Sequence, residues 1–437
     1  MYSEEGYLPN RVVGPIELAK FPNGARRGVV ATSPITTADA ILVSAPLAMV
    51  TAPQGTELGA ERLLAALNDQ KMSAADSHRL SLLCGDGSQA GPSPQVVPFE
   101  QLVDAERHVK RLTEKAAAAS KGFGSAKAKG AKGGGAAGDQ PEHLTDALQQ
   151  RLPGVVRTNA FGRVHRDLAA SVTRKEQPAS FIGLWPEFAM VNHCCAPNSV
   201  PTLVGDRLVL RAARDIGKGN EVTVTYLDEL TLTPLEQRRQ YLQSAYGFKC
   251  TCHRCALEER QPEAVTARLQ AIHATISEPA FQARARSALN TKNAPSVARV
   301  AEEVKGMTDG LEADMEASQV AAGDRPWLRA SAYAAYELAV LCTDVGDEGS
   351  PDAPRSLSGL HSLVLPGHDG HLLLALERFV RAGSQSRTGP ETESAARECI
   401  TAHTIRYGAV SDAVMAQIMD ARAQRDSYMG RYSVLKL

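Results

Sequence analysis

The sequence lacks a surplus of charge of either sign, with 48 Lys and Arg residues against 49 Asp and Glu in 437 residues. This balance gives no overall electrostatic reason to expect a nucleic acid or a membrane as partner. The chain also lacks any window of the roughly 18 apolar residues that a membrane helix requires. Its opening residues, MYSEEGYLPN, are polar and acidic, which argues against a secretory signal. We therefore expect a soluble intracellular protein, cytoplasmic and/or nuclear.

The chain is too long for one ordinary core, so we expect two or three domains. Residues 26–50 alternate short β-branched runs with turn residues and predict two or three short strands. Residues 104–118 are typical of a helix. Residues 116–140 form a Gly, Ala and Lys tract with too few apolar side chains to fold, and we interpret them as a disordered, solvated linker.

Strand patterns return between residues 200 and 226. The run RLVLRA places Leu208 and Leu210 on one face of a strand. In EVTVTY, Val222, Val224 and Tyr226 share a face. Tyr226 is therefore expected to end a half-buried strand with its ring pointing inward.

Beyond residue 262 the pattern becomes helical. One apolar stripe has spacings of three and four residues and consists of Val297, Val300, Val304, Met307 and Leu311. Residues 327–342, 371–382 and 408–424 have similar patterns. The C-terminal third is therefore predicted to be an array of helical hairpins.

The eight cysteines are not spaced like a disulfide framework. Five of them gather in two short segments, as Cys194, Cys195, Cys250, Cys252 and Cys255. The remaining three are isolated, as Cys84, Cys342 and Cys399. In a reducing compartment such clustering favours a metal site.

The segment KCTCHRC presents Cys250, Cys252 and Cys255 within six residues, so one loop can bring three sulfurs to a metal at about 2.3 Å each. A structural zinc site needs a fourth ligand. The candidates are local His253 and the distant His193, Cys194 and Cys195. Chance clustering and a redox dithiol are the alternatives, and zinc fits the spacing better.

Three segments in order, NHCCAPNSV, RAARDIGKGNEVTVTYLDEL and RRQYLQSAYGFKCTCHRC, resemble the catalytic half of SET-domain lysine methyltransferases of the SET-MYND (SMYD-like) type. In that family the Asn-His segment threads beneath the strand that leads to a tyrosine and forms a pseudoknot. RRGVVA resembles the opening of the first SET strand, and TNAFG resembles the entry to the second half. The resemblance covers residues 15–50 and 155–256 well and the C-terminal helices weakly.

The resemblance implies an α+β fold: a β-rich SET domain with a pseudoknot, a cysteine-rich zinc-binding post-SET segment and a C-terminal α-helical, TPR-like region. The implied segments are residues 1–50 (first part of the SET domain), 51–150 (insertion, helical and then the linker), 151–232 (second part, with the active site), 233–262 (post-SET segment) and 263–437 (helical region).

The resemblance also implies site residues. Asn192 and His193 match the pair that contacts S-adenosylmethionine, and Phe248 matches the aromatic residue that covers its adenine. Arg26 and Arg27 lie where the first loop of the family meets the same cofactor. A solvated arginine pair beside a glycine turn is the alternative for these two residues.

Tyr226 matches the catalytic tyrosine, which also borders the cofactor. Phe161 and Tyr246 match residues that line the channel for the substrate lysine. Cys195 matches the ligand that completes the structural zinc site with the three later cysteines, whereas Cys194 stands where the family usually has Ser and is expected to pack.

These residue types suit methyl transfer from a sulfonium to an amine, which requires aligned reactants and exclusion of water. Lysine has a pKa near 10.4, so its deprotonation at pH 7.5 costs about 4 kcal/mol, and aromatic walls offset part of this cost by desolvation. A tyrosine hydroxyl beside the amine orients its lone pair.

Two departures from the family pattern stand out. The insertion 51–150 holds one cysteine, Cys84, so the usual seven-Cys, one-His MYND finger is not expected. The strand motif reads Gly-Asn-Glu over residues 219–221 where Gly-Glu-Glu is common, which keeps Glu221.

Two other functions remain open beside the methyltransferase. A catalytically weak SET protein would act as a scaffold that binds protein partners through its C-terminal helices. A zinc-stabilised nucleic-acid binder would use the lysines at 121–132 and bind with a steep salt dependence. We expect a monomer whose substrate is a protein lysine, without a membrane partner and with nucleic acid disfavoured.

Overall fold

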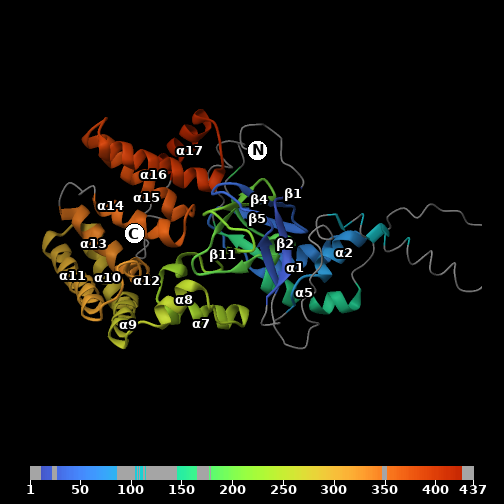
Figure 1. Cartoon of the computed structure of the whole chain (residues 1–437), viewed down its shortest axis with the longest axis horizontal. Helices are drawn as coiled ribbons and strands as arrows, with labels where there is room; N and C mark the ends of the chain where they lie inside the picture. Colours follow the sequence, from blue (N-terminus) through green and yellow to red (C-terminus); the bar gives the residue numbers. More distant parts are fainter. Residues whose placement is uncertain are drawn as a thin grey trace, which may run out of the picture.

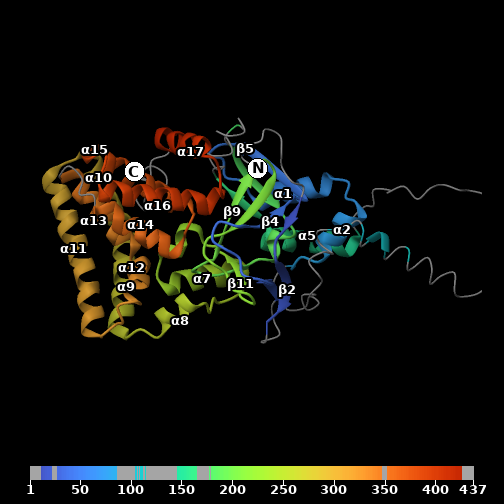
Figure 2. The same cartoon turned by 45° about the horizontal axis from the view of Figure 1, so that its top comes forward.

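The protein is described here by a computed structural model that covers residues 11–21, 27–85, 145–164, 177, 179–346 and 352–425, with a few positions between 104 and 114. The linker predicted at 116–140 lies outside these residues, as does most of the helix predicted at 104–118. Figures 1 and 2 show the strands on one side of the molecule and helices α9 to α16 on the other, with α7 and α8 between them.

The β-rich region contains three small sheets. The first has the order β1 (Val12–Val13), β4 (Ala40–Ser44), β10 (Arg207–Ala212) and β9 (Ser199–Val204). The second has the order β2 (Ile16–Lys20), β3 (Arg27–Ala31), β11 (Glu221–Val224) and β8 (Asn192–His193). The third has the order β5 (Ala48–Pro53), β7 (Ala179–Leu184) and β6 (Phe161–Arg163). The strands predicted over 26–50 are thus confirmed as β3, β4 and the start of β5.

The second sheet joins three distant parts of the chain. Strand β11 pairs antiparallel with β3 on one side and parallel with β8 on the other, where Thr223 faces Asn192 and Val224 faces His193. The short β8 therefore lies beside a strand that comes about 30 residues later. This pairing places the ends of β3, β8 and β11 at one edge.

Strand β10 is buried on both faces, not on one. Leu208 and Leu210 face the core of the β-rich region, as their spacing predicts. Val209, between them, packs with helix residues such as Leu372 and Cys399. The second face is buried because α15 (Asp369–Gln385) and α16 (Pro390–Tyr407) contribute to this cluster.

The remaining helices fall into three groups. Beside the sheets lie α1 (Ala60–Asp69), α2 (Ala74–Ser81) and α5 (Asp146–Asn159), and two 3₁₀ turns, η1 (Phe188–Met190) and η2 (Asp228–Leu232), flank the strand ends. Helices α7 (Leu235–Tyr246) and α8 (His253–Glu259) lie in the segment 233–262, for which a post-SET role is predicted. The C-terminal region consists of α9 (Glu263–Ser277), α10 (Pro279–Thr291), α11 (Ala294–Ala317), α12 (Arg325–Ser331), α13 (Tyr333–Gly346), α14 (Asp352–Val364), α15, α16 and α17 (Asp412–Arg425).

Helix α11 shows how local sequence builds this region. The Asn293 side chain caps it by accepting a hydrogen bond from the backbone N–H of Ser296, and a proline follows in the first turn, where no helical N–H is needed. The predicted apolar stripe is confirmed, with Val300, Val304 and Leu311 buried and Met307 partly buried. The predicted tract 327–342 is divided between α12 and α13, and the tract 408–424 contains most of α17.

None of the helices in the described part of the chain combines the length and the apolar character needed to cross a membrane.

Candidate active site and metal centre

Tyr226 lies two residues beyond the end of β11, partly buried between the β-rich core and the cysteine-containing segment. Its hydroxyl donates a 2.7 Å hydrogen bond to the carbonyl of Val191. Its backbone N–H donates to Nδ1 of His193 at 3.0 Å. The hydroxyl proton thus points at Val191, and a phenol oxygen can also act as a hydrogen-bond acceptor.

Asn192 and His193 both make contacts within the protein. Asn192 Nδ2 donates to the Arg27 carbonyl and to Glu221 Oε1, each at 2.7 Å, so this amide joins β8 to β3 and β11. Burial lowers the pKa of His193 to about 3, which leaves the ring neutral and Nδ1 free to accept from Tyr226. That these side chains also contact the cofactor stays a prediction.

Gly28 is needed at this junction. A Cβ on Gly28 would lie 2.5 Å from both Asn192 Nδ2 and Glu221 Oε1, well inside van der Waals contact. The glycine of RRGVVA is therefore explained by close approach of three strands. The Gly-Asn-Glu motif at 219–221 differs from the common Gly-Glu-Glu but keeps Glu221. The carboxylate of Glu221 accepts a hydrogen bond from Asn192.

Aromatic rings from the post-SET segment cover Tyr226. Its ring lies 5.0 Å from that of Tyr246 and 5.3 Å from that of His193, and Phe248 lies 6.1 Å from His193. Helix α7 ends after Tyr246 because Gly247 adopts a left-handed φ of 75°, which turns the chain and brings Phe248 to the same cluster. Burial raises the pKa of Tyr246 to about 12, so this phenol stays protonated.

The structure does not bring all predicted residues into this cluster. Phe161 makes its ring contacts with Phe181, Trp185 and Phe188, at 5.2 to 6.3 Å, on the same β-rich core against which Tyr226 packs. The buried side chain of Arg27 donates to the carbonyl of Leu82, while only its backbone carbonyl meets Asn192. Arg26 lies outside the described residues.

In the described part of the chain, Cys195, Cys250, Cys252 and Cys255 form a group that could hold a metal ion, with all four sulfurs within 4.8 Å of one another. A tetrahedral zinc with 2.3 Å bonds places its sulfurs about 3.8 Å apart. The sulfurs of Cys195 and Cys255 are 3.5 Å apart, and three of the four residues are buried. The four-thiol donor set and its closed, compact arrangement fit structural zinc.

The geometry also answers the question of the fourth ligand. Cys195 completes the group, as the resemblance implies. Cys194 is not one of the four; its sulfur hydrogen-bonds the backbone of Ala196 and also contacts Cys252. His253 packs its ring edge-on against Trp327 at 5.2 Å. His193 is a close neighbour of the group, with Nε2 3.2 Å from the sulfur of Cys195.

A cavity opens beside the Tyr226 strand end, between the β-rich region and the helices. It contains about 870 Å³ of empty space, part of it open to solvent. Its polar wall has residues from both regions, namely Arg163, Asp228, Glu229, His273, His361, His368 and Asp369. Because Asp228 follows Tyr226 by two residues, their Cα atoms are at most about 7 Å apart, so this wall of the cavity lies near the backbone of Tyr226.

The cavity wall holds carboxylates and one compensating arginine near the tyrosine. Arg163 pairs with Asp228 at 2.8 Å, and the exposed Glu229 is the next residue along the chain. His368 presents a buried Nε2 without a hydrogen-bond partner among the described residues. The sequence interpretation missed all four residues. The only available signal was the acidic pair directly after Tyr226-Leu227 in YLDEL.

Comparisons with known proteins agree with this geometry. Residues 26–227 match the SET domain model. The chain is 34% identical over 125 residues to human histone-lysine N-methyltransferase SMYD3, which is 29% of this chain and 28% of that protein. It is 34% identical over 93 residues to chicken N-lysine methyltransferase SMYD2, 21% of each chain. The aligned parts thus span less than a third of each relative's length.

The matched model, the parallel pairing of β8 with β11 and the tyrosine at the end of β11 define residues 26–227 as a SET domain. The chain also has helices in its C-terminal region and a cysteine cluster that could hold zinc, and its similarity to SMYD3 and SMYD2 extends over less than a third of their lengths.

Proposed function

We propose that this protein transfers the methyl group of S-adenosylmethionine to the ε-amine of a protein lysine. The observation that carries the proposal is the position of Tyr226. Its hydroxyl donates to the Val191 carbonyl, its ring lies among the rings of His193 and Tyr246, and Asp228, two residues later, lines the cavity. The names of the matched relatives, lysine methyltransferases SMYD3 and SMYD2, support the same reaction.

The chain's own residues would prepare the lysine for attack. Tyr226, Tyr246 and Phe248 exclude water from the amine, and a desolvated amine loses its proton more readily because burial disfavours the charged form. The Tyr226 oxygen, with its proton engaged by Val191, accepts a hydrogen bond from the neutral amine and directs its lone pair. Phe161 would complete the channel from the other side.

The cofactor would bind at the junction of β3, β8 and β11. Asn192, His193 and Phe248 come together there, and the backbone of Arg27 reaches the same point. The cofactor supplies an electrophilic methyl group on a sulfonium. The zinc group fixes the segment that carries Phe248, because Cys250 follows it by two residues.

The substrate would be a protein segment, histone or non-histone, that enters through the cavity. The carboxylates of Asp228 and Glu229 favour basic side chains near the target lysine. We further propose that the protein acts as a monomer in the cytoplasm or nucleus. The C-terminal helices remain available to protein partners.

Titration calorimetry with S-adenosylmethionine, followed by transfer of radiolabelled methyl to lysine-containing proteins, tests the proposal. An Asn192→Ala, His193→Ala double variant should lose micromolar binding. Because both side chains also hold the strands together, circular dichroism must confirm that the variant is folded. Wild-type protein that is folded and zinc-loaded but binds no cofactor would favour the scaffold function instead.

A further inference from the structure

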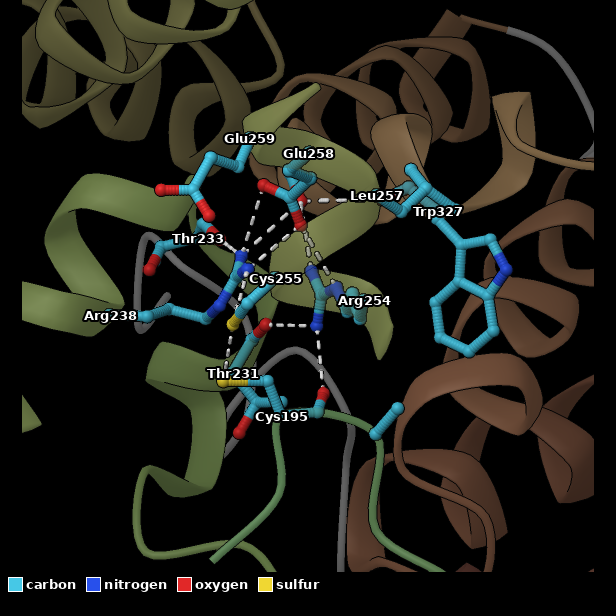
Figure 3. A network of polar contacts seen from close by, with 12 residues as sticks. Cys195, Thr231, Thr233, Arg238, Arg254, Cys255, Leu257, Glu258, Glu259 and Trp327 are labelled. Carbon is cyan, nitrogen blue, oxygen red and sulfur yellow. Dashed lines mark hydrogen bonds and ion pairs between the residues drawn. The ribbon is translucent and has the colours of Figure 1, made fainter. Parts of the chain in front are cut away.

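Three charged side chains are buried behind the cysteine group. Arg238 on α7 and Arg254 on α8 are both fully buried, and Glu258, also on α8, is 2% exposed. Burying isolated charges costs several kcal/mol each, so their partners must be well placed. Figure 3 shows both guanidinium groups beside the Glu258 carboxylate, where Arg238 Nη2 and Arg254 Nε each donate to Oε1.

Both arginines reach the zinc ligands. Arg238 Nη2 lies 3.8 Å from the sulfur of Cys255 and 2.8 Å from Glu258 Oε1. Arg254 Nη1 donates to the backbone carbonyl of Cys195 at 3.1 Å and to that of Thr231 at 2.7 Å (Figure 3). Arg238 thus contacts the sulfur of one candidate zinc ligand, Cys255. Arg254 holds the backbone of another, Cys195, which lies 59 positions earlier in the sequence.

The same three side chains also reach the helical region. Ser331, the last residue of α12, is 2% exposed and donates to Glu258 Oε1 at 2.9 Å. It accepts from Arg254 Nη2 at 2.9 Å. One helical turn earlier, Trp327 packs against His253, the first residue of α8. Helix α12 is therefore bound to α8 by a polar contact and an aromatic contact.

The charges of these groups are complementary to the metal site. Two arginines and one glutamate leave one positive charge in a dry environment. Four thiolates around Zn²⁺ carry a net charge of −2, and hydrogen bonds to ligand sulfur and ligand backbone stabilise such a group. The surplus cation therefore offsets part of the charge of the metal centre.

We propose that Arg238, Arg254, Glu258 and Ser331 are positioning residues that couple the zinc group to α12, so that binding of zinc orders the helical region next to the active site as well as the post-SET segment. This coupling is separate from methyl transfer and does not depend on it. Loss of zinc leaves the two buried arginines with a single anion, which favours opening of the contact with α12.

The chain offers a matched control for this coupling. Arg239 and Glu259 are the next residues along α7 and α8, and they form an ion pair at 2.8 Å in which the Glu259 side chain is 60% exposed. Arg239 also donates to the carbonyl of Cys250 at 3.3 Å. The two pairs join the same helices and differ in burial and in contact with a ligand sulfur.

The first test measures zinc release from the full-length protein to a chromogenic chelator. Arg238→Met should release zinc about ten- to a hundredfold faster than wild type, the effect typical of removing a group behind a metal ligand. Arg239→Met should stay within about threefold, as for a solvent-exposed pair. Equal rates for the two variants would overturn the proposal.

The second test needs no substitution and therefore holds even if Arg238→Met fails to fold. Hydrogen exchange of wild-type protein is followed with and without zinc. Removal of zinc should raise exchange in α7, α8 and α12, and leave α10 unchanged. Unchanged protection of α12 after zinc removal would show that the metal orders the post-SET segment alone. Neither readout involves cofactor or substrate, so both are separable from failure of the proposed reaction.

Discussion

The β-rich region and the C-terminal helical region are held together differently. In the β-rich region, Asn192 bonds to Arg27 across 165 positions, and Tyr226 bonds to Val191 across 35. In the helical region, the strongest packing partners are neighbours or next neighbours in sequence, such as α15 with α16 and α11 with α13. The chemistry of the site therefore depends on long-range strand pairing, whereas the helices form a locally built support.

The two regions meet at two places with different character. The cavity has polar residues of both regions facing open space. The Arg238–Glu258 contact with Ser331 is buried, although Ser331 also borders the cavity. We interpret the cavity as the entrance for a substrate. We interpret the Arg238–Glu258–Ser331 contact, which we call the joint, as the contact that fixes the two regions relative to each other.

Tyr226→Phe should give the largest effect, because it removes the hydroxyl while keeping the ring among its aromatic neighbours. We expect kcat to fall about 100-fold or more, the typical share of an oriented polar group, with little change in cofactor affinity. Single-turnover methyl transfer measures this. Tyr241→Phe, on the exposed side of α7, is the matched control. Activity that survives Tyr226→Phe would place the chemistry elsewhere.

Cys255→Ser should come next. It removes one sulfur of the zinc group, and we expect cofactor affinity to fall about ten- to a hundredfold because Phe248 and Tyr246 lose their support. Most helical circular dichroism should remain, since α9, α11 and α13 share a separate core. Cys342→Ser, a buried cysteine of that core, should keep zinc and cofactor binding. Calorimetry and metal analysis compare the two, and a zinc-free Cys255→Ser protein with full affinity would refute the role of the metal.

Much of the β-rich site was predictable because strand ends carry short, ordered motifs. The Asn192-His193 pair, Tyr226 and the four cysteines all come together as expected. The joint was not predictable from motifs. Arg238 stands between Leu235 and Leu242 and is fully buried, whereas its neighbour Arg239 is identical in type but only partly buried. Only the tertiary partner on α8 distinguishes them.

Other parts of the fold needed tertiary contacts as well. The alternation of β10 predicts one buried face, yet helices from residues 369–407 bury the second face. Cavity residues such as His368 and Asp369 lie more than 130 positions from Tyr226 and carry no local pattern. Such surfaces arise from how regions pack, and single-sequence periodicity does not contain that information.

Acid should affect the helical region more than the β-rich region. Burial lowers the pKa of His361 and His403 to about 3 and that of His371 to about 4. The unfolded chain, with histidine pKa near 6.5, binds more protons below that pH, so stability is lost as pH falls from 6.5 toward 4. Each histidine contributes up to about 1.4 kcal/mol per pH unit.

The two tryptophans allow each region to be followed separately. Trp327→Phe leaves Trp185 as a reporter of the β-rich core, and Trp185→Phe leaves Trp327 as a reporter of the helical region. Urea unfolding at pH 7, 6 and 5 should show a steeper loss for the Trp327 signal. Equal slopes would mean that the buried histidines do not set the acid limit. In the described β-rich region, His193 is the one histidine whose pKa is lowered by burial in this way.

Arg163→Gln should give the smallest effect and test the cavity as an entrance. The Arg163 side chain is 19% exposed and that of Asp228 is 46% exposed, so the pair is worth about 1 kcal/mol or less. Without the positive charge of Arg163, the negative charges of Asp228 and Glu229 at the cavity wall are less neutralised. KM for a peptide with a basic residue near the target lysine should fall about two- to fivefold, with kcat unchanged and the gain lost in high salt. As a control, Arg284→Gln breaks an exposed ion pair with Glu303 in the helical region and should change neither KM nor kcat. If KM falls equally for a peptide without basic neighbours, Arg163 acts only by filling space, and the carboxylates do not select the substrate.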